Sequence, residues 1–230
     1  FMNESFLLRE PLLAKLDVYE QIVMQATDRT DYDKKINEVK LFMDQLQTSA
    51  QVDSLKDVAF AAFVDLLENV PAKNGQYDLT YLIYNPHFSN GHISWNPSGT
   101  STFSYDIGES FNNTGTFTIK QTLSKMPAGW YTVTAKAFSR PTDFVSTLST
   151  YLTGTPRVKA SLTLDSKKVN VYNILDDPRF ATTSTGFEYY GLPDGASVPN
   201  TMNKANQIFG FGHYNNILRY QKTTAGNLSF

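Results

Sequence analysis

Glycine is distributed unevenly along this chain of 230 residues, and that distribution limits what each part can fold into. The first 70 residues contain no glycine, and all 13 glycines lie between Gly75 and the end. Pro11 is the only proline in those first 70 residues. Because glycine and proline mark turns and interrupt helices, we expect helices first and short, turn-linked strands afterwards. We predict two domains, 1–70 and 79–230, joined by a linker at 71–78.

The formal charge changes at the same boundary. Residues 1–70 carry 13 acidic and 7 basic side chains, whereas the other residues carry 9 acidic and 13 basic ones. The sequence contains no cluster of lysine and arginine of the kind that binds nucleic acid, so we expect no nucleic-acid partner. The chain has no cysteine, which excludes disulfides, thiolate nucleophiles and cysteine-ligated zinc. No apolar run approaches the roughly 18 residues that cross a bilayer, and no signal sequence is visible at the start, so we expect no transmembrane segment.

Three segments of the first domain repeat apolar residues every three or four positions, which places them on one face of a helix. These residues are Leu12, Leu16, Tyr19, Val23 and Ala26, then Ile36, Val39, Met43 and Leu46, then Leu55, Val58, Ala62, Leu66 and Val70. Thr30-Asp31 offers a cap for the second helix, and Ser54 and Asp57 have the spacing of a capping box for the third. We predict a three-helix bundle whose apolar stripes form its own core.

From residue 79 the apolar period changes to 2, which is typical of strands. The alternating segments are 116–123, 129–140, 157–164 and 167–175, and the last two flank a turn, which predicts a hairpin. Asn85-Pro86 ends the first strand, because proline cannot donate to a ladder. The segments YNNILRYQ and GNLSF read as two more strands.

One helix interrupts the strands, beginning near Pro199 and ending near Gly210. Within 129–140, Tyr131 and Val133 fall on one side of the strand and Trp130 falls on the other, so we expect Trp130 to point outward. Short strands separated by glycine, proline and asparagine predict an antiparallel β-sandwich or jelly roll. The fold class is therefore α+β, with a helical bundle followed by a sandwich.

Five pieces of the second domain, in this order, resemble a family of domains: LIYNPHFSNGHISW, FTIKQTLSKMPAGWYTVTAKAFSR, VYNILDD, VPNTMNKANQIFGFGHYNNILRY and GNLSF. The family is the galactose-binding-like β-sandwich, similar to a carbohydrate-binding module, found in surface and secreted proteins of gut Bacteroidetes-type bacteria. The resemblance covers residues 79–230. It implies a jelly roll, carbohydrate binding, and a location that is secreted or anchored at the outer surface.

The chain departs from the family pattern at two places. Ser89 stands where related modules carry a glutamate that often binds a structural calcium, and a hydroxyl lacks the anionic oxygen that calcium prefers. This substitution argues against calcium, and we expect no cofactor. The family pattern also continues past the GNLSF-like strand to a final strand, whereas this sequence ends at Phe230, so we expect the sandwich to lack its last strand.

The sequence contains no constellation typical of an active site. His87 and His92 have only Asn85, Ser89 and Asn90 nearby as further ligands, which is a poor set for a metal. No serine elbow, phosphate loop or dinucleotide fingerprint is present. Paired carboxylates of a glycoside hydrolase cannot be recognised by spacing, but the second domain holds only 9 acids. We therefore expect a protein without catalytic activity.

Sugar binding needs an aromatic face beside polar side chains, and several segments offer both. The candidate ligand-binding residues are Trp130, then Arg140, Asp143 and Phe144 after a strand, then Glu188, Tyr189 and Tyr190 in a long loop. For Trp130 the alternative is a contact with the helical domain. For Tyr189 and Tyr190 the alternative is that they cover an open end of the sandwich.

Three functions remain open at this point. The first is a carbohydrate-binding module at the bacterial surface that contacts a glycan. The second is a structural or adhesion module with a protein partner in a surface assembly. The third is an accessory region of a larger glycan-degrading enzyme.

Overall fold

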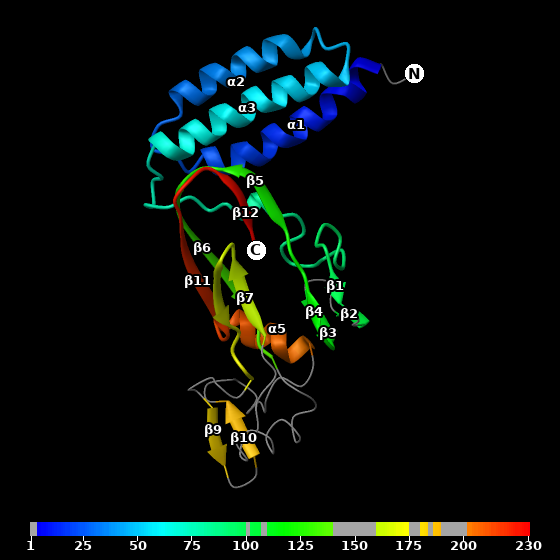
Figure 1. Cartoon of the computed structure of the whole chain (residues 1–230), viewed down its shortest axis with the longest axis vertical. Coiled ribbons are helices and arrows are strands. Elements are labelled where there is room, and N and C mark those ends of the chain that lie inside the picture. The colour runs from blue at the N-terminus through cyan, green and yellow to red at the C-terminus, as the bar shows by residue number, and fades with distance from the viewer. Residues whose placement is uncertain are drawn as a thin grey trace. The chain divides into compact units, whose positions relative to one another are not determined.

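The computed structural model describes residues 4–99, 102–106, 110–139, 160–174, 180–183, 186–189 and 202–230. Within these residues it is an α+β structure with four α-helices and small antiparallel sheets (Figure 1). The chain divides into two compact units. The helical unit comprises Phe1–Tyr84, Leu123–Ala128 and Thr223–Gly226, and the β unit comprises Asn85–Thr122, Gly129–Lys222 and Asn227–Phe230.

Three helices lie side by side in the helical unit, as predicted: α1 (Glu4–Val23), α2 (Thr30–Met43) and α3 (Ser49–Asn69) (Figure 1). Leu12, Ile22 and Phe63 are completely buried in their common core. The rings of Tyr19 and Phe63 stack there with centroids 4.5 Å apart. Each large apolar side chain buried in this way contributes roughly 1.5–3 kcal/mol. None of the described helices is long and apolar enough to cross a membrane.

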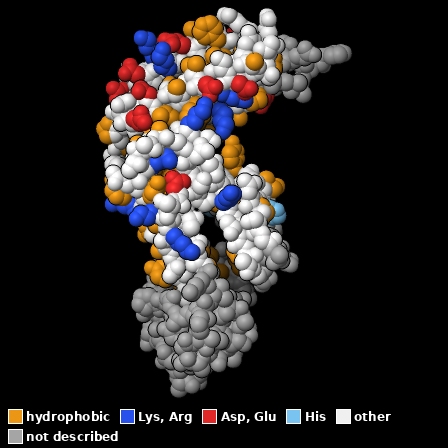
Figure 2. Space-filling model, viewed as in Figure 1, with side chains coloured by type: hydrophobic (Ala, Val, Ile, Leu, Met, Phe, Trp, Pro, Cys, Tyr) orange, Lys and Arg blue, Asp and Glu red, His pale blue; other side chains and the backbone are white. Residues whose placement is uncertain are grey.

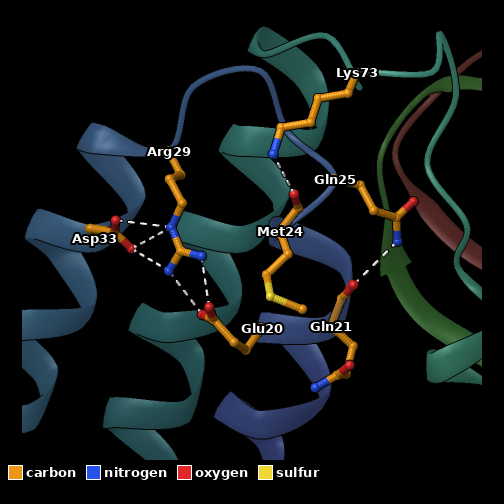
Figure 3. Close-up of polar contacts among 7 residues, drawn as sticks. All are labelled: Glu20, Gln21, Met24, Gln25, Arg29, Asp33 and Lys73. Atoms are coloured by element: carbon orange, nitrogen blue, oxygen red, sulfur yellow. Dashed lines mark hydrogen bonds and ion pairs between the residues drawn. The ribbon is translucent and has the colours of Figure 1, made fainter.

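Charged side chains hold the end of α1 against the start of α2 (Figure 3). The Arg29 guanidinium donates to both carboxylate oxygens of Glu20, at 2.6 and 2.9 Å, and to Asp33 at 2.6–2.9 Å. The Thr30 backbone N–H donates to Asp28 at 2.9 Å, and this bond lowers the pKa of the Asp28 carboxyl. Thr30 is itself the first helical residue, so the predicted Thr30-Asp31 cap is wrong.

The start of α3 also differs from the prediction. Thr48 caps the helix: its hydroxyl accepts from the Gln51 N–H at 3.3 Å, and the Gln51 side chain accepts from the Thr48 N–H at 3.1 Å. Ser54 therefore lies inside the helix rather than at its cap. The buried face consists of Val52, Ala59, Phe63 and Leu66. Val58, predicted to face the core, is 43% exposed. The prediction failed here because apolar residues occur on several faces of this helix, which makes the helical period ambiguous.

Residues 71–84 run along the end of α1 as part of the helical unit. Ala72 forms a β-bridge with Ala26. The Gln25 side chain donates to the Asp78 carbonyl at 3.1 Å and accepts from the Asp78 N–H at 2.7 Å. The segment then forms a short 3₁₀ helix, η1 (Thr80–Leu82), and turns. The strand predicted to end at Asn85-Pro86 is therefore absent from this described part of the chain.

The described strands form two-stranded pairs. They are β1 (Ser98–Gly99) with β4 (Phe117–Thr118), β2 (Thr102–Asp106) with β3 (Ser110–Thr114), β5 (Thr122–Met126) with β12 (Gly226–Ser229), β6 (Gly129–Lys136) with β11 (Asn215–Lys222), β7 (Ser161–Leu164) with β8 (Lys167–Asn170), and β9 (Phe180–Thr183) with β10 (Gly186–Tyr189). The β7–β8 hairpin is antiparallel, as predicted. The helix α5 (Met202–Gly210) also lies where the sequence predicts it.

The predicted strand at 116–123 is broken into β4 and the start of β5. Between them, the Lys120 carbonyl accepts from the Asn96 N–H at 3.0 Å. Gln121 and Phe230 then exchange two backbone hydrogen bonds, at 2.9 and 3.0 Å. The backbone thus changes partner within a few residues, which interrupts one regular ladder although the side chains alternate throughout.

A buried asparagine joins several segments inside the β unit. The Asn216 side-chain nitrogen lies 3.0, 2.7 and 2.9 Å from the carbonyls of Ala135, Ala137 and Tyr214. Its oxygen accepts from the Tyr172 N–H at 2.9 Å. This one side chain therefore connects β6, β11 and the segment after β8.

Candidate functional site

The β6 strand exposes one of its two faces. The side chains of Trp130, Thr132 and Thr134 are exposed, and those of Tyr131 and Val133 between them are partly buried. Trp130 is 59% exposed, which confirms the predicted outward orientation. The cause is the two-residue period of a strand, which sends successive side chains to opposite faces.

The neighbouring strand β11 adds polar side chains to the same face. The register pairs Trp130 with Gln221, Thr132 with Arg219, and Thr134 with Ile217. These β11 residues are exposed, whereas Asn216, Leu218 and Lys222 on the other face are buried. The guanidinium carbon of Arg219 lies 4.8 Å from the centroid of the Trp130 ring. We call this surface the Trp130 face; it comprises Trp130, Thr132, Thr134, Ile217, Arg219 and Gln221.

The chemistry of the Trp130 face is that of a binding surface. A guanidinium over an exposed indole contributes roughly 0.5–1 kcal/mol, which holds Arg219 in place without burying its donors. The indole offers an apolar surface, the guanidinium and the Gln221 amide offer donors, and the threonine hydroxyls can donate or accept. The six residues include no carboxylate, histidine or other general base. The arrangement can stack and hydrogen-bond a ligand, and it contains no group that would activate one.

The other predicted site residues fall in parts of the chain that the structure shows less fully. Arg140, Asp143, Phe144 and Tyr190 lie outside the described residues. For Glu188 and Tyr189 the backbone position alone is described: they lie on β10 opposite Ala181 and Phe180, so the prediction that both belong to a long loop is wrong. These residues stay predictions.

Only Trp130 of the six residues on the Trp130 face was predicted; Thr132, Thr134, Ile217, Arg219 and Gln221 were not. The alternation in NNILRYQK places Ile217, Arg219 and Gln221 on one side of a strand, so a signal was present. What the sequence lacks is the register that brings this strand beside Trp130, because that pairing joins segments far apart in the chain.

The loop from Asn85 to Trp95, which carries two histidines, is organised around Asn85. The Asn85 side-chain nitrogen donates to the Gly91 carbonyl at 2.8 Å, and its backbone carbonyl accepts from the Trp95 indole N–H at 3.0 Å. The Trp95 ring stacks on Phe88 at 5.0 Å between centroids and meets Phe230 edge-on at 5.8 Å. These contacts give Phe88 and Trp95 a structural role in the loop.

The geometry of this loop favours a structural role for it over a role as an active site. Asn85, Phe88 and Ser94 adopt φ values of +49°, +57° and +69°, a region that only a well-bonded turn stabilises in residues other than glycine. His87 and His92 are exposed on the loop. Among the residues that the structure describes, no three histidine, aspartate or glutamate side chains gather as a metal site would require. We therefore take the Trp130 face as the candidate site.

The chain was compared with protein-family models, curated proteins and solved structures. No protein-family model, no curated protein and no solved structure matches the chain.

Proposed function

We propose that this chain is a non-catalytic carbohydrate-binding protein, and that a glycan binds at the Trp130 face. The observation that carries the proposal is the exposed Trp130 ring with Arg219 over it and Gln221 in register beside it. Sugar rings present patches of C–H groups that pack on aromatic faces, and their hydroxyls need donors and acceptors close to that contact. The face offers both within two neighbouring strands.

The finer architecture belongs to the same proposal. We propose that the β unit is a galactose-binding-like jelly roll, in keeping with the five sequence pieces that resemble this family. Arg140, Asp143, Phe144, Glu188, Tyr189 and Tyr190 are then further ligand-binding candidates. The same resemblance supports a secreted or surface-anchored protein, free or as an accessory region of a larger glycan-degrading enzyme.

Glycan-array screening of the full chain, followed by calorimetry on each ligand found, tests the proposal. We expect Trp130→Ala to weaken binding at least about tenfold, the equivalent of about 1.4 kcal/mol, because the stacking surface is lost. Trp130→Phe should retain part of the affinity.

The matched control is Phe211→Ala, which removes an aromatic ring that is 55% exposed but lies outside the Trp130 face. This variant should bind like the unmodified chain. Absence of binding across plant, host and microbial glycans would refute the function. Binding that survives Trp130→Ala would refute the assigned site and favour the other ligand-binding candidates.

A further inference from the structure

The outer face of α3 carries an open groove with a volume of about 450 Å³. Its lining residues are Asp57, Phe60, Ala61, Val64, Asp65 and Glu68 of α3, with Lys125 of β5, and all of them belong to the helical unit. We call it the α3 groove. Its α3 residues are spaced three or four apart, so they form one continuous strip along the helix.

The floor and the rim of the α3 groove differ in chemistry. Phe60 and Val64 form an apolar floor that is only partly buried, and the small side chain of Ala61 between them is exposed. Asp57, Asp65 and Glu68 are exposed around this floor and make the rim acidic. An apolar strip between carboxylates is a surface for an amphipathic, positively charged segment, which would pack its apolar side chains on the floor and place its cations on the rim.

The structure already shows a cation at one end of this rim. The Lys125 ammonium lies 3.0 Å from the Asp57 carboxylate, with the two side chains 68% and 71% exposed. Lys125 makes this contact from a backbone with φ of +55°, which is uncommon for a residue other than glycine. Asp65 and Glu68 stand two to three turns further along α3, about 12–16 Å away at 1.5 Å per residue.

The charge of the surrounding surface is consistent with a basic partner. Residues 1–70 carry nearly twice as many acidic as basic side chains. Figure 2 shows several red acidic side chains, with blue basic ones among them, over the helices on the face in view. Such a field raises the association rate of a positively charged partner and disfavours an acidic one.

We propose that the α3 groove binds a short basic segment of a partner protein, with leucine-like anchors on Phe60, Ala61 and Val64 and lysine or arginine side chains on Asp65 and Glu68. The Lys125–Asp57 ion pair closes the other end of the groove and sets the register of the bound segment. The groove residues lie in the helical unit and the Trp130 face lies in the β unit, so the two sites share no residue and can be tested separately.

Fluorescence anisotropy with the full chain and two peptides tests the proposal. The first probe is an amidated peptide with leucines at helical spacing flanked by lysines; the second has glutamates in place of the lysines. We expect the basic peptide to bind at least about tenfold more tightly than the acidic one at low salt. The difference should shrink towards 1 M salt, where the Debye length falls to about 3 Å.

Two variants, each with a matched control, locate the binding. Ala61→Phe should fill the groove and abolish binding of the basic peptide, whereas Ala14→Phe, at an exposed alanine of α1, should leave it unchanged. Asp65→Lys should weaken binding several-fold, whereas Asp17→Lys alters the net charge equally outside the groove and should have a smaller effect. Trp130→Ala should have no effect.

Three outcomes would overturn the proposal. The first is equal affinity for the basic and acidic peptides. The second is equal binding by the Ala61→Phe and Ala14→Phe variants. The third is self-association of the chain in sedimentation velocity that Ala61→Phe abolishes, because the occupant would then be a second copy of this chain.

Discussion

At the scale of single residues, Asn216 has more buried partners than its amide can serve at once. Its two N–H groups face three carbonyls, and its oxygen holds the Tyr172 N–H. Replacement by alanine leaves the Tyr172 N–H without its acceptor and removes the amide donor to the Ala135 and Ala137 carbonyls, whereas the Tyr214 carbonyl still accepts from the Ala137 N–H. A polar group that loses its partner away from water costs roughly 1–3 kcal/mol. We expect Asn216→Ala to lower the free energy of unfolding by at least about 3 kcal/mol in urea denaturation.

The control for this prediction is Asn227→Ala, because Asn227 is an exposed asparagine of the same unit. Surface substitutions of this kind stay within about 0.5 kcal/mol. Similar unfolding free energies for the two alanine variants would show that Asn216 is not a structural hub.

At the scale of elements, the N-terminal cap of α3 is a different residue in the structure from the one that the sequence predicts. Thr48 and Gln51 form the capping box, whereas the sequence suggested Ser54 and Asp57. We expect Thr48→Ala to reduce the free energy of unfolding by about 1 kcal/mol, because the Gln51 N–H loses its acceptor. Ser54→Ala should be neutral or slightly stabilising, since alanine favours a helix interior. Urea denaturation of both variants decides between the caps, and the opposite ranking would place the helix start at Ser54.

Elements were predictable where a strong period coincided with clear boundaries. The three long helices, α5 and β6 lie where the sequence indicates, because apolar residues recur at the helix or strand period between polar or turn residues. Prediction failed where two local signals competed, as at Thr48 and Ser54, and where alternation continued through a change of backbone partner, as at Gln121.

The candidate site was predictable only in part. Alternation within one strand was sufficient to place Trp130 on the outside. Its neighbour Arg219 depends on the pairing of β6 with β11, which no local pattern specifies. The α3 groove also escaped prediction, because it depends on where Lys125 meets the helix.

At the scale of the whole molecule, alkaline pH should act on the helical unit through its tyrosines. Burial raises the pKa of Tyr19 from 10.0 to about 12, and it also raises the pKa values of Tyr32 and Tyr77. The folded state therefore keeps these hydroxyls protonated at pH values where the unfolded chain releases the protons. Their contribution to stability is complete below about pH 10 and falls as the pH rises from 10 towards 12.

We expect helical circular dichroism to be lost cooperatively within this window, together with the appearance of tyrosinate absorbance. Tyr19→Phe removes one of the ionisable groups and should make the stability fall less steeply with pH. Helix loss that begins well below pH 10, or an unchanged pH dependence in Tyr19→Phe, would contradict this account.

The composition of the helical unit also affects how the molecule can be divided. Beyond Phe1–Tyr84 it includes Leu123–Ala128 and Thr223–Gly226, two short stretches that the gene encodes much later. A fragment ending at Tyr84 would keep every long helix but lack both stretches, and with them Lys125. Transferring the helical unit to another protein therefore requires three separate pieces of coding sequence. A single recombination event cannot move the whole unit.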